Sequence, residues 1–369
     1  PVGEPHRYLS HPGERVVNGA SHKKLLAIGN LKQPVHAWGE IYTGISAKDY
    51  MDGTSNFYGV HSVTLYVDSV QVFNSTTDKV LPDENRMING FTDYEELTRT
   101  RRLIMRSYKL PGNRLRLLHP NENRGAVTID EERDYHFRYV LEDNFGNRRT
   151  YQFIVKGKRQ DIPEYKPEAN EMLYWNRTNV IQKPGMELVV PRYYVYEDVP
   201  LRTDMRGDSS HIAFDYILDA GRTPIHSYCD LSIGLRHMPV ADTTKYYIVQ
   251  KAGKWRSSMG GKYANGWIKT RVRSLGTFSV DVDTIAPQIT PIGQGGWRTS
   301  RNIRFRIKDM ESGIGSYKVY IDGKFVLFGL KKGILVIQDP EKVKKGVPHK
   351  LEVTVTDQCG NMTRKEYKF

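Results

Sequence analysis

An internal repeat is the sequence feature that most constrains the fold. Residues 59–68 resemble residues 313–322, which lie 254 positions later and share four of ten residues, namely Gly, Ser, Tyr and Asp. A second pair of segments, 143–147 and 357–361, lies 214 positions apart and shares an Asp-x-x-Gly-Asn pattern. Self-similarity of this kind indicates two copies of one structural unit.

Each copy reads as a strand, an Asp-containing turn, a second strand, an interval, and a further pair of strands around the Asp-x-x-Gly-Asn turn. Asp accepts hydrogen bonds from backbone amides, and Gly-Asn tolerates the positive φ of a tight hairpin. The residues expected to build these turns are Asp68, Asp143, Gly146, Asn147, Asp322, Asp357, Gly360 and Asn361.

Apolar residues alternate with polar ones through most of the chain, for example at 63–67, 303–307 and 351–355. This period of two is typical of antiparallel strands. Segments 193–196 and 276–282 also predict strands. The stretch from Asp93 to Arg106 fits either a helix or a charged hairpin.

These patterns predict an all-β protein of tandem Ig-like β-sandwich modules, the first and third related as the repeat. A polar, Pro-bearing stretch over 156–167 and a terminal strand near 278–283 suggest boundaries. The expected modules are 1–160, 161–285 and 286–369. The two repeat offsets differ by 40 positions, so the first module is expected to carry an insertion of that length between Asn74 and Val127.

The chain carries a formal charge of +13, from 55 basic and 42 acidic residues. The basic residues are spread along the sequence and form no zinc-finger or RNP pattern, which argues against a specific nucleic-acid partner. The stretch of ~18 apolar residues that a transmembrane helix requires is absent.

One basic cluster stands out within the insertion. It reads either as a solvated face or as a contact for a polyanion, with tyrosine rings as stacking surfaces. The candidate binding residues are Arg99, Arg101, Arg102, Arg106, Tyr94 and Tyr108.

Catalytic patterns are missing from the sequence. It contains no Gly-x-Ser-x-Gly elbow, no His-Glu-x-x-His and no His-x-His. The spacing of His211 and Asp215 offers half of a metal site and is interpreted as chance. We therefore expect no catalytic residue, metal or cofactor in this chain, and leave open whether calcium binds at the Asp turns. Cys229 and Cys359 lie in different predicted modules and are not expected to form a disulfide.

Several runs resemble a known family. They are residues 58–68, Asp83-Glu-Asn-Arg-Met-Ile-Asn89, Asp93-Tyr94 and residues 110–115. Together they look like the Ig-like region downstream of the catalytic domain in lysostaphin-type zinc metallopeptidases of Bacteroidetes, which are exported and act on peptidoglycan. The resemblance covers the first 160 residues well and the rest only by module type.

The family's catalytic His-x-His pattern has no counterpart here, so no catalytic residue carries over. The resemblance implies a non-catalytic accessory region of an exported peptidase, located in the periplasm or at the cell surface. Zinc would belong to the parent's catalytic domain, and the partner would be a cell-wall or envelope polymer or that domain itself. The alternative is a stand-alone surface adhesion or glycan-binding protein of stacked β-sandwiches.

Overall fold

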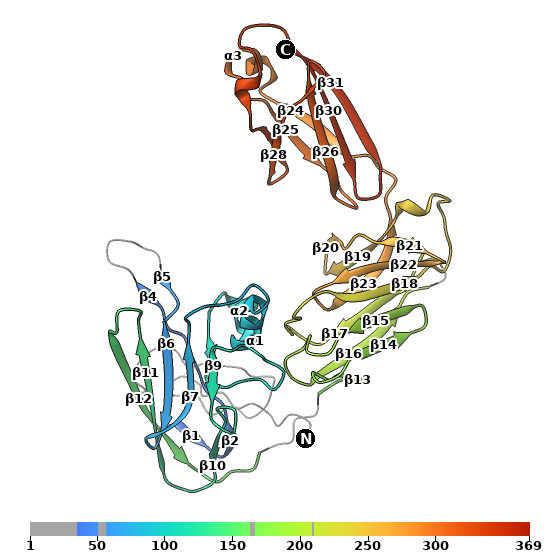
Figure 1. The fold of residues 1–369 in the computed structure, drawn as a ribbon. Coiled ribbons are helices and arrows are strands. Elements are labelled where there is room, and N and C mark those ends of the chain that lie inside the picture. Colours follow the sequence, from blue (N-terminus) through green and yellow to red (C-terminus); the bar gives the residue numbers. More distant parts are fainter. Residues whose placement is uncertain (1–34, 51–56, 163–166, 209) are drawn as a thin grey trace.

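The computed structural model describes residues 35–50, 57–162, 167–208 and 210–369. The regular structure of this part is almost entirely β, in sheets that fall into three groups along the chain (Figure 1). Three separate hydrophobic cores accompany these groups. The prediction of tandem β-sandwich modules is therefore confirmed. The groups are called module one, module two and module three below.

Module one is built around a six-stranded sheet. Its strand order is β1 (Val35–Ala37), β12 (Arg148–Gly157), β11 (Asp134–Glu142), β6 (Ser62–Val67), β7 (Val70–Thr76) and β9 (Leu118–Pro120). Three short pairs accompany it: β2 (Gly39–Ile41) with β10 (Val127–Ile129), β3 (Gly44–Ile45) with β8 (Met105–Arg106), and β4 (Asp49–Tyr50) with β5 (Phe57–Tyr58).

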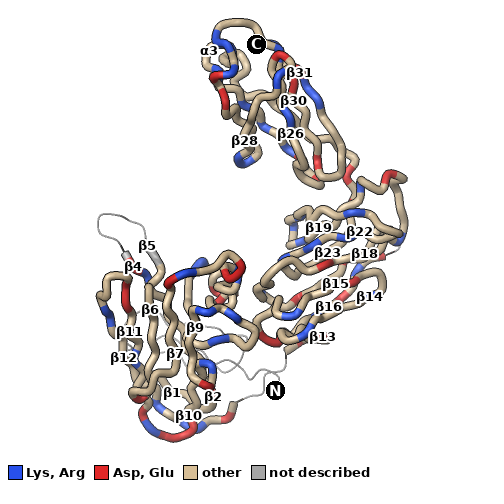
Figure 2. Tube along the Cα trace, in the orientation of Figure 1, with Lys and Arg blue, Asp and Glu red and all other residues tan. Residues whose placement is uncertain are grey.

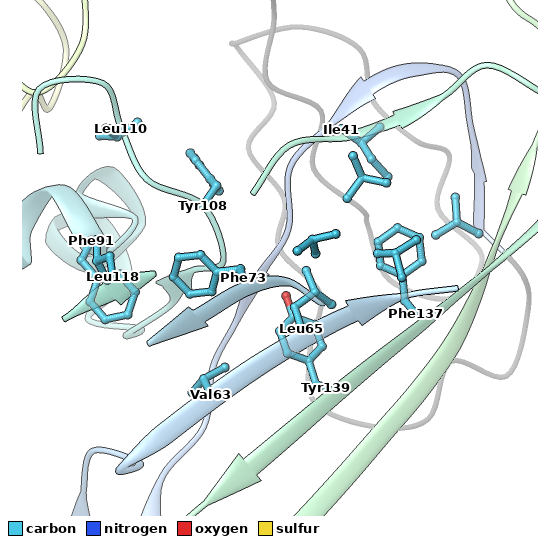
Figure 3. Packing of buried hydrophobic residues seen from close by; sticks show 14 of the residues in the cluster. Ile41, Val63, Leu65, Phe73, Phe91, Tyr108, Leu110, Leu118, Phe137 and Tyr139 are labelled. Atoms are coloured by element: carbon cyan, nitrogen blue, oxygen red, sulfur yellow. The ribbon is translucent and has the colours of Figure 1, made fainter. Parts of the chain in front are cut away.

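The alternation of apolar residues explains the core of module one. Along β6, the side chains of Val63, Leu65 and Val67 are buried, while the polar residues between them are partly exposed. Phe137 and Tyr139 of β11 contribute to the same core (Figure 3). Burial of aromatic and aliphatic side chains from adjacent strands is the main term that stabilises such a sandwich.

The predicted insertion contains the helices of module one. These are η1 (Asn85–Met87), α1 (Ile88–Phe91) and α2 (Tyr94–Thr100). The structure decides the alternative at Asp93–Arg106 in favour of a helix followed by a short strand. Asp93 caps α2 by accepting a 3.1 Å hydrogen bond from the Glu96 amide, and the helix ends at Arg101 with φ 65°.

Module two contains two facing sheets. One has the order β13 (Glu171–Leu173), β16 (Val199–Arg206), β17 (Asp215–Asp219), β23 (Gly276–Val282), β19 (Tyr246–Ala252) and β20 (Trp255–Ser258). The other has the order β14 (Asn179–Lys183), β15 (Met186–Val190), β18 (Cys229–Gly234), β22 (Trp267–Val272) and β21 (Lys262–Ala264), and η2 (Thr243–Lys245) precedes β19. The strand expected at 276–282 is β23. The strand expected at 193–196 is wrong, because these residues form turns between β15 and β16.

Module three has two four-stranded sheets. They are β24 (Gln288–Ile292), β25 (Arg304–Lys308), β29 (Ile334–Ile337) and β28 (Phe328–Lys331), and β27 (Lys324–Phe325), β26 (Ile314–Ile321), β30 (Lys350–Asp357) and β31 (Met362–Lys368). Short helices η3 (Gln294–Gly296), α3 (Trp297–Ser300) and η4 (Pro340–Lys342) lie in its loops.

The repeat is visible in strand order and register. The order β12-β11-β6-β7 in module one corresponds to β31-β30-β26-β27 in module three. Phe137 pairs with Val67 in module one, and Leu351 pairs with Ile321 in module three. These pairs are related by the two sequence offsets, so both repeat segments keep their register.

Candidate functional sites at the module joints and on the surface

The Asp-x-x-Gly-Asn turn of module one is held by one carboxylate. Asp143 Oδ1 accepts hydrogen bonds from the amides of Phe145 (2.8 Å) and Asn147 (2.9 Å), and its Oδ2 accepts one from Asn147 Nδ2 (2.7 Å). Gly146 has φ 83°, a value that glycine adopts without strain. The turn residues 144–147 are exposed.

The corresponding turn of module three repeats these bonds. Asp357 Oδ1 accepts from the amides of Cys359 and Asn361, both at 2.8 Å, and Oδ2 accepts from Asn361 Nδ2 at 2.8 Å. Gly360 has φ 80°. Here, however, Asp357 and Cys359 are buried, and Cys359 lies against module two.

The other turn pair is equally well matched. Asp68 (φ 48°) donates its amide to His136 O at 2.9 Å and accepts the His136 amide at 2.8 Å. Asp322 (φ 50°) makes the same two bonds with Lys350, at 2.8 and 2.9 Å. All eight residues expected to build turns therefore lie in these two matched pairs of turns.

The joint between modules two and three is formed by the Asp357–Asn361 turn. The Cys359 side chain lies buried with Tyr247 and Val249 of β19. Its carbonyl accepts a 3.0 Å hydrogen bond from Lys245 Nζ, and Asn361 Nδ2 donates to the Asp283 carbonyl at 3.0 Å. The turn thus makes both apolar and polar contacts across the joint.

Three carboxylates converge at the same joint. Oxygens of Asp283, Asp309 and Asp357 lie within 4.8 Å of one another, and Asp283 is fully buried. Burial raises the pKa of Asp357, and the nearby Asp283 carboxylate adds to this rise, against the opposing effect of hydrogen bonds from Asn361. A set of carboxylate oxygens is the donor type that calcium prefers. These three residues are where a hard cation could bind, and the expectation of a metal-free chain stays a prediction.

The joint between modules one and two depends on Tyr196. Its side chain is 3% exposed and packs into the core of module one. The Tyr196 hydroxyl donates to Arg86 O at 2.8 Å, and the Tyr196 carbonyl accepts from the Gly112 amide at 2.7 Å. A Cβ atom at Gly90 would lie 2.7 Å from the Tyr196 ring, so only glycine fits there. Sequence reasoning missed this residue, because its spacing also fits a strand.

Arg99, Arg101 and Arg102 of the predicted arginine cluster lie at the surface, so a polyanion contact there stays a prediction. Arg101 and Arg102 are exposed, and Tyr94 is partly buried. Arg99 forms an ion pair with Glu96 of the same helix.

The expectation is wrong for Arg106 and Tyr108, which are 7% and 2% exposed. The pairing of β8 with β3 turns Arg106 inward, and Tyr108 packs on Tyr42 with ring centroids 4.6 Å apart.

The remaining sequence candidates are also placed by the structure. His211 Nδ1 lies 2.9 Å from Asp208, whereas Asp215 forms an ion pair with Lys251 at 2.6 Å. His211 and Asp215 therefore have separate partners, in keeping with a chance spacing. The prediction that the cysteines do not pair is confirmed, because Cys229 and Cys359 are both free and buried. Burial raises their thiol pKa values to about 12 and about 11.

An open groove of about 690 Å³ lies on module two, between β13 and β14. Arg177 lies over the Tyr174 ring at 3.8 Å, and the Asn179 side chain fixes the loop by accepting from the Tyr174 amide at 2.8 Å. The lining mixes polar and apolar groups, and the groove is open to solvent, unlike the enclosed clefts that bind most small ligands. No sequence pattern pointed to this groove.

Comparisons with known proteins assign a family model to one part of the chain. Residues 170–283, which form most of module two, match the family model of a Zu5-like domain. No curated protein matches the chain. One similar structure is described as a Ca²⁺-stabilized adhesin that helps an Antarctic bacterium bind ice. It is 10% identical, with 89% of this chain and 93% of that chain covered and a TM-score of 0.17.

A second similar structure is the Bacteroides ovatus mixed-linkage glucan utilization protein SGBP-B in complex with a heptasaccharide. It is 10% identical, with 89% of this chain and 62% of that chain covered and a TM-score of 0.15. At such TM-scores the whole chains do not superpose. No helix among the described residues is long and apolar enough to cross a membrane.

Proposed function

We propose that this chain is a non-catalytic binding region of an exported protein, in which joined β-sandwich modules hold a binding surface in a fixed position. The observation that carries this proposal is that a buried side chain connects neighbouring modules at each of the two joints. Domains within a chain move relative to one another by default, and buried contacts between them restrict this motion. Here Tyr196 is buried in the core of the preceding module, and Cys359 is buried against β19 of module two.

Such a region suits a surface adhesion or glycan-binding protein. Fixed joints keep the distance and orientation of a binding face under load. The partner would be an envelope or extracellular polymer. The role as accessory region of a lysostaphin-type zinc peptidase stays a hypothesis of the same kind, because it also requires binding without catalysis in this chain.

The direct test uses the whole chain and isolated cell-envelope material. We expect the chain to cosediment with insoluble envelope polymer and to release no soluble fragments from it. A heat-unfolded sample of the same chain is the control for non-specific trapping. Absence of binding by the folded chain, or steady release of soluble products, would contradict the proposal.

A further inference from the structure

The positive charge of the chain is concentrated in module three. Residues 286–369 contain 16 Lys and Arg and 8 Asp and Glu, so this module carries +8 of the total +13. Basic positions are distributed over much of its trace (Figure 2). A single-sign field of this kind attracts anionic polymers.

The two sheets of module three differ in their acidic residues: the strands β27, β26, β30 and β31 contain six Lys and Arg with three Asp and Glu, whereas the cations of the other sheet are not offset by acids. The four strands β24, β25, β29 and β28 contain no Asp or Glu. Along β25, Arg304, Arg306 and Lys308 are exposed, while Phe305 and Ile307 between them are buried. Successive outward side chains on a strand lie about 6.6 Å apart, so these three cations form a line roughly 13 Å long.

Strand register fixes the neighbours of this line. Arg306 pairs with Thr290 on β24 and with Ile334 on β29, and Ile334 pairs with Lys331 on β28. Paired residues point to the same face of a sheet. The outward face therefore contains four cations, hydroxyl and amide groups, and aliphatic side chains. Its residues are Gln288, Thr290, Ile292, Arg304, Arg306, Lys308, Gly329, Lys331, Ile334 and Val336, and they are called the β25 face below.

The opposite sheet of the same module differs in its charge balance. There Arg364 forms an ion pair with Glu352, and Lys350 forms one with Glu366 at 3.0 Å. No ion pair among the described residues joins a carboxylate to the four cations of the β25 face. The basic groups of that face are therefore available to an external anion.

We propose that the β25 face binds an acidic polysaccharide, an inference that rests on the proposed binding function and names its ligand class. The arginine fork grips carboxylate or sulfate groups in a bidentate way, and a row of cations matches charges repeated along a polymer. Ile334, between Arg306 and Lys331, and Val336, beside Arg304, are partly exposed and offer an apolar surface to the C–H faces of sugar rings. The face contains no aromatic residue on which nucleic-acid bases could stack, which favours polysaccharide over single-stranded nucleic acid.

The test measures binding of the full chain to dextran sulfate and polygalacturonate, with neutral dextran and DNA as comparisons. The double variant Arg304→Gln/Arg306→Gln should bind the acidic polysaccharides roughly tenfold more weakly, as expected for two exposed charge-assisted contacts. Its dependence on salt should also be smaller, since fewer counterions are released. The matched control is Lys318→Gln/Arg364→Gln, which removes the same charge from the opposite sheet and should leave affinity within about twofold.

The two double variants distinguish binding at the β25 face from attraction by net charge. Equal weakening by both double variants would show that net charge alone matters and would overturn the proposal, as would tighter binding to DNA or no binding to either acidic polysaccharide. Unchanged melting temperatures of both variants establish that folding is intact. If the chain binds envelope material but salt and the β25 substitutions have no effect, the ligand class is wrong while the binding function stands.

Discussion

Modules one and three place the same turn in two different environments. Asp143 and Asp357 make matching hydrogen bonds to backbone amides and to an Asn side chain. The hydrogen bond from the Asn147 side chain, with the backbone amides, lowers the pKa of Asp143. Burial and the neighbouring Asp283 raise the pKa of Asp357. The five-residue pattern determines the hydrogen bonds of the turn, whereas contact with the neighbouring module determines whether the pKa of its Asp is raised or lowered.

The residue at the centre of the turn shows the same contrast. Phe145 is 90% exposed, whereas Cys359, its counterpart, is 3% exposed at the joint. An exposed Phe is unremarkable by itself. The comparison shows that the turn serves as a docking element in module three, while module one contacts its neighbour through the pocket for Tyr196.

The largest effect is expected from removing that aromatic anchor. Tyr196→Ala empties a site in the core of module one and should lower the free energy of unfolding by about 3–5 kcal/mol. Tyr196→Phe keeps the ring and loses the hydrogen bonds of the hydroxyl group to the Arg86 carbonyl and to His226 Nδ1, so it should cost about 1–2 kcal/mol. Denaturant unfolding followed by tyrosine and tryptophan fluorescence measures both. A cost for Tyr196→Ala no greater than that of Tyr196→Phe would show that the joint does not depend on the buried ring.

A smaller effect is expected at the two turn centres, and it should be asymmetric. Cys359→Asp places a carboxylate in a buried apolar contact beside two other acids and should destabilise module three by on the order of 3 kcal/mol. Phe145→Asp changes an exposed side chain and should leave stability unaltered. Calorimetry of the full chain compares the two variants, with Cys359→Ser as the uncharged control. Similar losses for both Asp variants would remove the distinction between the turns.

The carboxylates of the two turns should titrate in opposite directions from an ordinary Asp. Asp357 should titrate above the usual value, so its stabilising contribution is complete below the unfolded pKa and is lost as pH rises through the folded one. Asp143 should titrate below it, so its contribution is present above the unfolded pKa and is lost as pH falls. NMR titration of the side-chain carboxyl carbons measures both. Repeating the titration with calcium tests the three-carboxylate group, since a bound cation would lower the pKa of Asp357 and leave that of Asp143 unchanged.

The smallest expected effect is a dependence of stability on pH, which should distinguish the Asp322 turn from the Asp68 turn. Asp68 is paired with Arg133, which stays charged, whereas Asp322 is paired with His349. Burial opposes protonation of His349, but hydrogen bonds to Asp322 and to the Lys344 carbonyl outweigh it and raise the His349 pKa. This contribution is complete below the unfolded pKa of about 6.5 and is lost as pH rises through the folded value.

Module three should therefore melt at a lower temperature at pH 8.5 than at pH 6, by a few degrees. His349→Gln should remove that dependence. A transition of module three that is insensitive to pH in the unsubstituted chain would count against the role of this histidine.

The parts of the structure that sequence could predict are those set by neighbouring residues. Alternation identified the β class, and Asp-x-x-Gly-Asn identified both turns, because their hydrogen bonds lie within five residues. The burial of Arg106 and Tyr108 depends on the pairing of β8 with the distant β3, which no local pattern encodes. Asp283, Asp309 and Asp357 come from three separate segments, so the sequence could leave calcium open at an Asp turn but could not predict that these three carboxylates converge. The alternation at 303–307 predicted the outward cations of β25. That the neighbouring strands contribute no acidic residue to the same face is known only from the strand order.

The Asp357–Asn361 turn is expected to hold module three in a fixed orientation on module two. Electron–electron double resonance between spin labels at Lys254→Cys and Lys318→Cys measures the distance between these modules directly, since both positions are exposed and both native thiols are buried. The account predicts one narrow distance distribution in the otherwise unsubstituted chain and a broad one when Cys359→Asp is added. A broad distribution without that substitution, or a narrow one that survives it, would contradict the claim.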